Sequence, residues 1–138
     1  MAPHRIEVVF FDIGETLGRV DATGHLVAFS SSRPLLEMMK NVLGLRIGVI
    51  TNLPATMTDQ QIQDMLDGAG LLSFLDPNGL ITNHQAHADK PKAKIYRFAA
   101  QKMGVVVQQC LFIGENEQEV LGAKTAGMGG ILKPPSQH

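Results

Sequence analysis

The feature that most constrains the fold is an uninterrupted apolar run, Val-Val-Phe-Phe at residues 8–11, which ends in Asp12 and a glycine-containing turn. Because the run is continuous and rich in β-branched and aromatic residues, it predicts a strand buried on both faces, as in a parallel sheet. Asp12 is then expected at the carboxyl end of this strand, the edge of an open α/β sheet at which ligands bind. Its position alone is compatible with a nucleophile, a metal ligand, or a helix cap or turn residue.

The composition is that of an ordinary globular protein, and it narrows the classes of function. With a net charge of −1, the chain has no basic footprint that would indicate a nucleic-acid partner. It has no apolar run of membrane-spanning length and no signal-peptide segment before the first strand, so we expect a cytoplasmic protein without a membrane partner. The single cysteine, Cys110, has no partner for an internal disulfide and is interpreted as a strand-entry residue, with a catalytic thiol as the alternative.

Apolar segments of strand length alternate with segments of helical period along the rest of the chain. The pattern predicts strands over residues 45–52, 80–82, 111–114 and 130–132, helices over 33–44, 58–69, 92–103 and 118–126, an irregular loop or small flap over 18–32, and a polar loop over 83–89. This order favours right-handed βαβ crossovers and therefore a three-layer, Rossmann-like α/β fold with a doubly wound parallel sheet. We expect one domain without a cap domain, with flexible tails at residues 1–5 and 133–138.

Polar residues stand at the points where the predicted strands end, or just beyond them. They are Asp12, Thr51 with Asn52, Lys90, and Glu115 with Glu119. Because the carboxyl ends of parallel strands meet at one edge of a sheet, we expect these side chains to converge. Polar residues are common in strand-to-helix loops, which explains any one of these clusters but less easily all four.

The four clusters also resemble, in the same order, the four signatures of the haloacid dehalogenase superfamily. The segment Phe-Phe-Asp-Ile-Gly-Glu-Thr-Leu around Asp12 is similar to the first signature, and the strand ending at Thr51 to the second. Lys90 with the following proline is similar to the third signature, and Glu115 with the later Gly-Ala-Lys-Thr-Ala-Gly at residues 122–127 to the fourth. The resemblance covers residues 6–132 and implies the core fold of that superfamily.

The resemblance implies a metal-dependent phosphomonoester phosphatase. In the family, the aspartate that matches Asp12 attacks a phosphoryl group and forms an aspartyl-phosphate, which water then hydrolyses. By the same resemblance, Thr51, Asn52 and Lys90 bind the phosphoryl oxygens and neutralise the charge that develops on them.

The resemblance also implies Mg²⁺ as the cofactor. Its ligands would be Asp12, the backbone carbonyl of Gly14, Glu115, and Glu119 through a water molecule. Glutamate at residues 115 and 119 replaces the aspartate that is usual in the family, and its longer side chain is expected to weaken or alter metal binding.

Gly14 is the second departure from the family pattern. Many phosphatases of the family carry there an aspartate that protonates the leaving group, and general acid–base help of this kind is typically worth about 10² to 10⁴ in rate. A protein with Gly14 keeps the carbonyl ligand but loses the acid, so slow turnover is expected. Glu15, one residue further on, is a possible surrogate acid; the alternative is a solvent-facing turn residue.

Three functions are therefore compatible with the sequence. The first is the phosphatase, the second a catalytically degenerate binding or regulatory module, and the third a dehalogenase-type hydrolase that needs no metal. Since the intervals around residues 17–50 and 51–90 have no room for a cap, we expect an open site that takes a phosphorylated small molecule or a bulky or macromolecular phosphate. A homodimer that covers the open site is also expected. His84 and His87 have metal-ligand spacing only if their segment is helical, and exposed histidines are the alternative.

Overall fold

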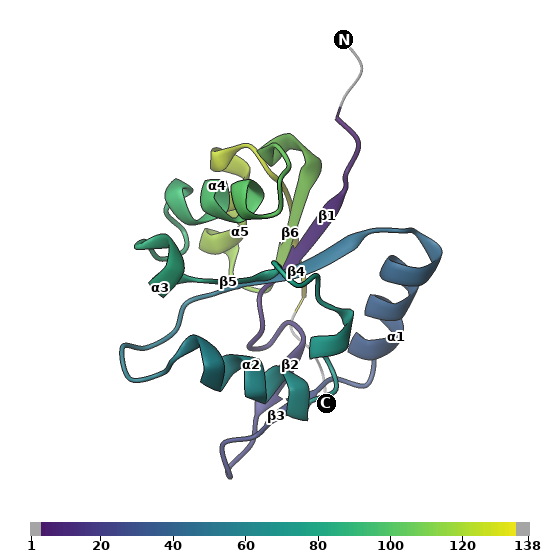
Figure 1. Cartoon of the computed structure of the whole chain (residues 1–138), viewed down its shortest axis with the longest axis vertical. Helices are drawn as coiled ribbons and strands as arrows, with labels where there is room; N and C mark the ends of the chain where they lie inside the picture. The colour runs from purple at the N-terminus through teal and green to yellow at the C-terminus, as the bar shows by residue number, and fades with distance from the viewer. Residues whose placement is uncertain (1–3, 135–138) are drawn as a thin grey trace.

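The computed structural model describes residues 4–134 and has a five-stranded sheet in which all neighbouring strands are parallel (Figure 1). The strands are β5 (Leu80–Thr82), β4 (Arg46–Thr51), β1 (Val8–Phe11), β6 (Cys110–Gly114) and β7 (Gly129–Leu132), in that order across the sheet. Every connection between parallel neighbours must cross one face of the sheet, and helices make these crossings. The prediction of a doubly wound, Rossmann-like α/β fold is confirmed.

Helices cover both faces of this sheet. They are α1 (Ser32–Glu37), which continues in a π-helical segment over Met38–Val42, α2 (Asp59–Gly68), α3 (Asn83–Ala86), α4 (Ala93–Lys102) and α5 (Glu117–Ala126). Figure 1 shows α4 and α5 on one side of the sheet and α1 and α2 on the other. The start of α2 is fixed by a capping box, in which the Thr58 hydroxyl accepts from Gln61 N and the Gln61 side chain accepts from Thr58 N.

The central strand β1 explains why its sequence is continuously apolar. Val8 and Phe10 belong to the hydrophobic cluster under α4 and α5, whereas Val9 and Phe11 belong to the cluster under α1 and α2. All four side chains are fully buried. Because successive side chains of a strand point to opposite faces, a strand covered on both faces needs an apolar residue at every position.

The register of β1 places Asp12 at the centre of the carboxyl edge of the sheet. Phe11 is paired with Val49 of β4 on one side and with Ile113 of β6 on the other. Asp12 N donates to Ile113 O at 3.0 Å, so the residue after the strand is still held against β6. The ends of β4 and β6 therefore flank Asp12, as the sequence predicted.

Residues 18–32 are more regular than the predicted loop or flap. They form an antiparallel hairpin of β2 (Gly18–Val20) and β3 (Leu26–Ala28). The Asp21 carboxylate closes its turn by accepting from the backbone N–H groups of Thr23 and His25. Strands of three residues are too short to give a recognisable alternation, which is why the sequence pattern missed them.

Two further segments differ from the prediction. The first part of the predicted polar loop is helix α3, because the Thr82 hydroxyl caps it by accepting from Gln85 N. Lys133, expected in a flexible tail, is tied down: its backbone N donates to Gly114 O and its ammonium to Thr16 O. Residues 4, 5 and 134 of the predicted tails have no regular secondary structure, and residues 1–3 and 135–138 lie outside the described residues.

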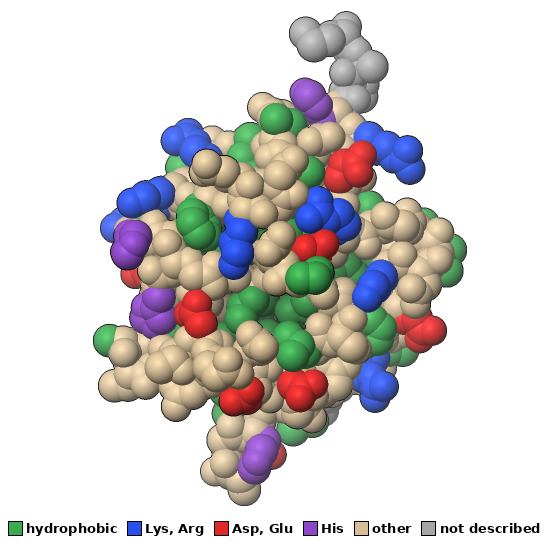
Figure 2. All heavy atoms as spheres, in the orientation of Figure 1, with side chains coloured by type: hydrophobic (Ala, Val, Ile, Leu, Met, Phe, Trp, Pro, Cys, Tyr) green, Lys and Arg blue, Asp and Glu red, His purple; other side chains and the backbone are tan. Residues whose placement is uncertain are grey.

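Charged side chains of both signs are interspersed over the face seen in Figure 2. This distribution gives that face no field of a single sign. Within residues 4–134, no helix combines the length and the apolar character that crossing a bilayer requires.

Candidate active site

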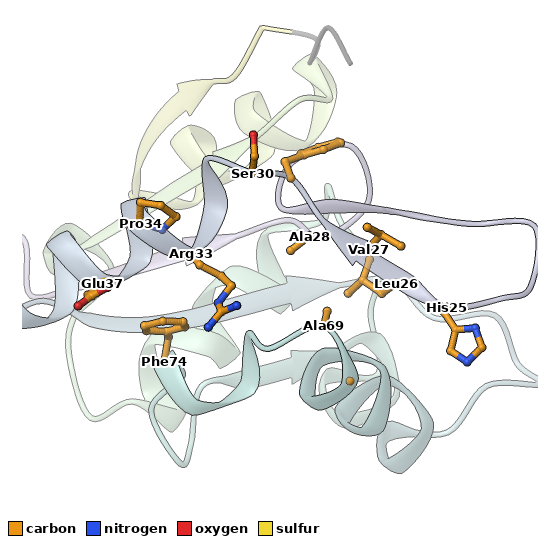
Figure 3. Close-up of a pocket in the computed structure, with 12 residues that line it drawn as sticks. His25, Leu26, Val27, Ala28, Ser30, Arg33, Pro34, Glu37, Ala69 and Phe74 are labelled. Carbon is orange, nitrogen blue, oxygen red and sulfur yellow. The ribbon is translucent and has the colours of Figure 1, made fainter.

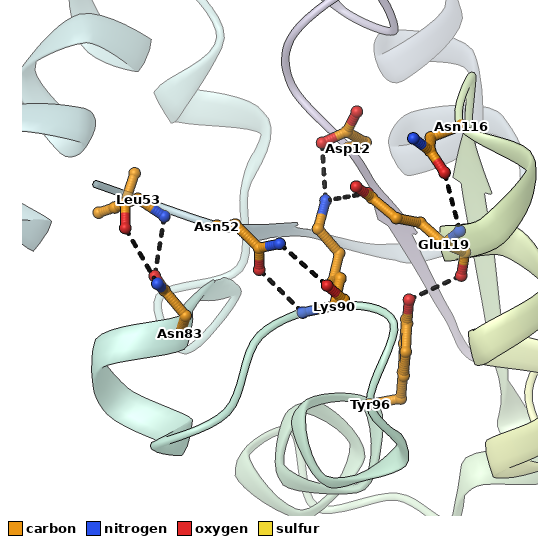
Figure 4. Close-up of polar contacts among 8 residues, drawn as sticks. All are labelled: Asp12, Asn52, Leu53, Asn83, Lys90, Tyr96, Asn116 and Glu119. Atoms are coloured by element: carbon orange, nitrogen blue, oxygen red, sulfur yellow. Dashed lines mark hydrogen bonds and ion pairs between the residues drawn. The ribbon is translucent and has the colours of Figure 1, made fainter. Parts of the chain in front are cut away.

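The polar centre of the molecule is a buried lysine between two carboxylates (Figure 4). Lys90 Nζ lies 2.8 Å from Asp12 Oδ1 and 2.7 Å from Glu119 Oε1. The Lys90 side chain is 2% exposed, whereas the Asp12 and Glu119 side chains are 16% and 20% exposed. The three residues come from the end of β1, the segment before α4, and α5, so the fold joins three distant parts of the sequence at one point.

Lys90 reduces the repulsion between the negatively charged carboxylates of Asp12 and Glu119. A buried ammonium is stable only when it is paired, and two adjacent carboxylates repel each other unless a cation lies between them. The Phe112 ring adds a cation–π contact at 5.5 Å from Lys90 Nζ. The ammonium is therefore held at the carboxyl edge of the sheet, next to the residue predicted as the nucleophile.

The backbone of Lys90 is fixed by the side chain of Asn52. Asn52 Nδ2 donates to Lys90 O at 3.1 Å, and Lys90 N donates to Asn52 Oδ1 at 2.9 Å. Asn83 makes an equivalent pair of hydrogen bonds with Leu53: its Nδ2 donates to Leu53 O, and its Oδ1 accepts from Leu53 N (Figure 4). Both polar atoms of the Asn52 amide are thus used to position Lys90, and direct binding of phosphate by Asn52 stays a prediction.

Glu119 is held through its own backbone. Asn116, the N-cap of α5, accepts from Glu119 N at 3.1 Å, and the Tyr96 hydroxyl donates to Glu119 O at 2.6 Å. Burial, together with the charges of Glu119 and Asp12, raises the pKa of Tyr96, so its phenol stays a neutral donor. Neither Tyr96 nor Asn116 was assigned a role from the sequence. The available signals were a lone tyrosine inside an apolar helix and an asparagine three residues before a helical glutamate.

The other predicted residues lie around the same edge. Thr51 ends β4 and is 7% exposed. Glu115 follows β6, and its charge, with that of Glu15, acts on the Lys133 ammonium, whose pKa is lowered mainly by burial. Glu15, the predicted surrogate acid, has φ +63° and is bound through both carboxylate oxygens to Arg19 at 2.7 and 2.8 Å.

The metal ligands predicted from the sequence are of the chemical type that a hard cation such as Mg²⁺ prefers. They are oxygen donors alone, namely the carboxylates of Asp12, Glu115 and Glu119 and the carbonyl of Gly14. Glu119 Oε1 is buried and lies 2.7 Å from Lys90 Nζ, so its charge is already paired with the ammonium. Within residues 4–134, no three His, Cys, Asp or Glu side chains are grouped closely enough to form a metal site.

A large cleft lies away from this centre. It has a volume of about 820 Å³ and lies between β3, α1 and the end of α2 (Figure 3). Its walls include Val27, Arg33 and Phe74, but none of the predicted site residues. The size of this cleft therefore does not make it the candidate active site. The candidate site is defined by the ionisable groups at the sheet edge.

Two predicted alternatives receive no support from the geometry. Burial raises the pKa of the Cys110 thiol to about 12, so this fully buried cysteine is not a thiolate nucleophile at neutral pH. The ring of His84 contacts Met57 O at 2.9 Å, and His87 ends α3 with φ +55°. Within the described residues, these histidines belong to no metal cluster.

The structure thus has an open parallel sheet with an aspartate at the end of its central strand and a lysine bound to that aspartate. The family model of the haloacid dehalogenase-like hydrolases matches residues 2–127, and the chain therefore belongs to this family. A protein of Mycobacterium tuberculosis named as a phosphatase is 29% identical over 118 residues, which cover 86% of this chain and 52% of that protein. The glyceraldehyde 3-phosphate phosphatase of Methanothermobacter thermautotrophicus is 28% identical over 116 residues, covering 80% and 49%.

A solved structure agrees with these similarities. The crystal structure of a phosphatase of the same family from Thermococcus onnurineus superposes with a TM-score of 0.67 and 28% identity, covering 78% of this chain and 46% of that one. The chain thus spans about half the length of the named relatives that it matches.

Proposed function

We propose that this protein is a phosphomonoester phosphatase that acts through an aspartyl-phosphate at Asp12. The observation that supports this most strongly is the 2.8 Å contact between Asp12 Oδ1 and the buried Lys90 ammonium at the edge where ligands bind. A carboxylate is a weak nucleophile, and an incoming phosphate dianion would be repelled by it. A fixed cation beside the carboxylate attracts the dianion and compensates the charge that accumulates during transfer.

Each neighbouring group has a defined part in this proposal. Lys90 has three N–H donors, so it can contact a phosphoryl oxygen while it remains paired with Asp12 and Glu119. Thr51, buried at the end of β4, supplies a hydroxyl donor for a second phosphoryl oxygen. Asn52 holds the Lys90 backbone, so that the ammonium does not have to be ordered when the substrate binds.

We include Mg²⁺ in the proposal, held by Asp12, the Gly14 carbonyl and Glu115, with Glu119 acting through water. When bound, the ion would neutralise phosphoryl charge. Support comes from the donor set, which consists of carboxylate and carbonyl oxygens alone. Because glutamate replaces aspartate, we expect weak affinity and tolerance of Mn²⁺.

The substrate is proposed to be a phosphorylated small molecule or a bulky phosphate that reaches an open edge. The named relatives that suggest a phosphate ester are about twice as long, so their individual substrates are not carried over. A second copy of this chain is the proposed cover for the edge. Val20 and Val27 of the β2–β3 hairpin are each 52% exposed and would be buried by such a contact.

The test is phosphate release from a panel of phosphomonoesters, with Mg²⁺, with Mn²⁺ and with chelator. Wild type is compared with Asp12→Asn and with the matched control Asp67→Asn, which removes an exposed carboxylate on α2. We expect metal-dependent release by wild type and by the control, and none by Asp12→Asn. Lys90 keeps its Glu119 partner in Asp12→Asn, so that variant should fold, as circular dichroism would verify.

The competing functions give different results in the same assay. Release of halide from 2-haloacids without phosphate release would assign the dehalogenase function instead. Binding of inorganic phosphate by folded wild type with no release from any ester would assign the binding module.

A further inference from the structure

The turn that follows Asp12 lacks a group that could donate a proton to a departing oxygen. Gly14 has no side chain, and both carboxylate oxygens of Glu15 are bonded to Arg19. The Thr16 hydroxyl is buried, and within residues 4–134 it has no hydrogen-bond partner, while the Thr16 carbonyl accepts from Lys133. The side chains of residues 14–16 are therefore absent, occupied or inaccessible as proton donors.

The charged groups on the other side of Asp12 are placed to contact the nucleophile. Lys90 Nζ lies 2.8 Å from Asp12 Oδ1, and Glu119 Oε1 lies 2.7 Å from Lys90 Nζ. In phosphoryl transfer the attacking and leaving oxygens lie roughly in line, on opposite sides of phosphorus. A cation bonded to the attacking oxygen can reach the equatorial phosphoryl oxygens but not the leaving oxygen. Lys90 thus stabilises phosphoryl charge without protonating the leaving group.

We propose that the Asp12 site is selective for activated phosphates, namely aryl and acyl phosphates, and that it retains the phosphoryl group on Asp12. The inference rests on the proposed function of the same site. In the first step an Asp12 carboxylate oxygen bonds to phosphorus as the bond to the leaving oxygen breaks. The leaving oxygen takes the electron pair and departs as a phenolate or carboxylate, which needs no proton. An alkoxide is far more basic, so an alkyl phosphate reacts slowly without a general acid.

The lack of a side chain that can transfer a proton also slows the second step, the hydrolysis of the aspartyl-phosphate. Water attacks phosphorus, the bond from phosphorus to the Asp12 oxygen breaks, and Asp12 leaves as a carboxylate while the water proton goes to solvent. No residue of the 14–16 turn is placed to take that proton. Phosphorylated Asp12 should therefore accumulate during turnover of an activated donor.

Glu115 is a further acid at this edge, and it could protonate the leaving oxygen. It is partly buried directly after β6, and its carboxylate makes no hydrogen bond within the described residues. If Glu115 protonated the leaving oxygen, its replacement by glutamine would slow alkyl phosphates selectively. The experiment therefore includes Glu115→Gln.

The test measures kcat/KM for acetyl, p-nitrophenyl, phenyl and methyl phosphate, and the fraction of phosphorylated enzyme trapped by rapid acid quench. We expect methyl phosphate to react at least about 10²-fold more slowly than p-nitrophenyl phosphate, as the loss of general acid catalysis predicts. A Cβ at residue 14 would meet no atom within 4 Å, so Gly14→Asp should fold. It should raise methyl phosphate turnover by about 10² to 10⁴ and lower the trapped fraction, whereas Gly14→Asn, of similar shape, should do neither.

The outcomes separate this inference from the proposed function. Similar rates for methyl and p-nitrophenyl phosphate in wild type, or loss of methyl phosphate turnover alone in Glu115→Gln, would overturn the leaving-group selectivity while the phosphatase stands. No phosphate release and no trapped phosphoenzyme with any donor, acetyl phosphate included, would overturn the proposed function itself. The wild-type comparison decides the inference even if Gly14→Asp does not fold.

Discussion

At the scale of single residues, the site is organised by Lys90. Its ammonium is almost completely buried, yet it can remain charged because two carboxylates lie within 2.8 Å of it. A long, flexible side chain gains precision only when its backbone is fixed, and the double contact from Asn52 provides this. The position of the cation beside Asp12 thus depends on a neutral side chain from another strand.

Replacing Asn52 with alanine should reduce both stability and turnover. Two backbone groups of Lys90 would lose their partners, which is expected to lower the free energy of unfolding by about 2 kcal/mol. A displaced ammonium should lower kcat for p-nitrophenyl phosphate by about 10-fold to 10²-fold. Chemical denaturation and steady-state kinetics measure the two effects separately.

Asn83→Ala is the matched control, because Asn83 makes the same pair of bonds with the Leu53 backbone. It should lose similar stability but keep most of the turnover. Equal loss of turnover in both variants would mean that Asn52 has only a structural role.

The sequence predicted the ionisable residues of the site better than the residues that hold them. Asp12 and Lys90 could be found because Asp12 directly follows an apolar strand and Lys90 lies in the loop that precedes α4. Tyr96 could not be assigned, since its hydroxyl bonds a backbone carbonyl whose position depends on how α4 and α5 pack. The ion pair of Glu15 with Arg19 depends on the left-handed backbone at Glu15, which local pattern does not predict.

At the scale of elements, the close approach of α5 to the segment before α4 brings Glu119 to Lys90. Gly122 makes this approach possible: a Cβ there would overlap the carbonyl oxygen of Pro91 and lie 2.7 Å from Pro91 Cβ. Any larger residue at 122 must push α5 away from the residue that follows Lys90.

Gly122→Ala should therefore destabilise the protein by about 1 to 3 kcal/mol, although alanine is the better helix former. The control is Gly68→Ala at the end of α2, where a Cβ would meet no atom within 4 Å. That substitution should leave stability unchanged or raise it slightly. Denaturant midpoints that do not differ between the two variants would contradict the packing described here.

The ion pair between Arg46 and Asp76 should make the stability of the fold depend on pH. The hydrogen bond from Arg46 at the start of β4 lowers the pKa of Asp76 below its ordinary value of 3.8. Because the folded-state pKa is depressed, the stabilisation is fully present above the ordinary value and is lost as pH falls through the folded value. The urea midpoint of wild type should exceed that of Asp76→Asn at pH 7, and the difference should shrink below about pH 4. A difference that stays constant down to pH 2 would contradict this assignment.

The order of strands and helices followed from the sequence because most elements carry either a continuous apolar run or a clear helical period. The β2–β3 hairpin and α3 were missed for the opposite reason. Each is only three or four residues long and is fixed by side-chain hydrogen bonds to nearby backbone, such as those of Asp21 and Thr82.

At the scale of the whole molecule, two hydrophobic clusters pack against the sheet, one on each face, and together they form the core. Cys110 lies inside that core with no exposed surface, and burial raises its pKa to about 12. Alkylation by iodoacetamide at neutral pH should therefore require unfolding that exposes β6. Mass spectrometry should find native protein unlabelled over a time in which protein in denaturant is fully labelled. Rapid labelling of native protein would show that β6 opens locally.

The topology of the sheet also determines where the polar residues of the candidate site lie. Every parallel strand ends at the same edge, so one aspartate after the central strand meets a lysine 78 residues later in the chain. This convergence could be predicted from topology alone, because it follows from strand direction. The distances between the side chains could not, because they depend on the packing of α4 and α5.

The most direct test of the central claim is to identify the residue that carries the phosphoryl group. Wild-type protein is incubated with acetyl phosphate and Mg²⁺, quenched in acid, digested, and mapped by mass spectrometry. We expect the added mass of one phosphoryl group on the peptide that contains Asp12, and no added mass in Asp12→Asn. A phosphoryl group on a histidine, or phosphate release without any modification of Asp12, would contradict the central claim.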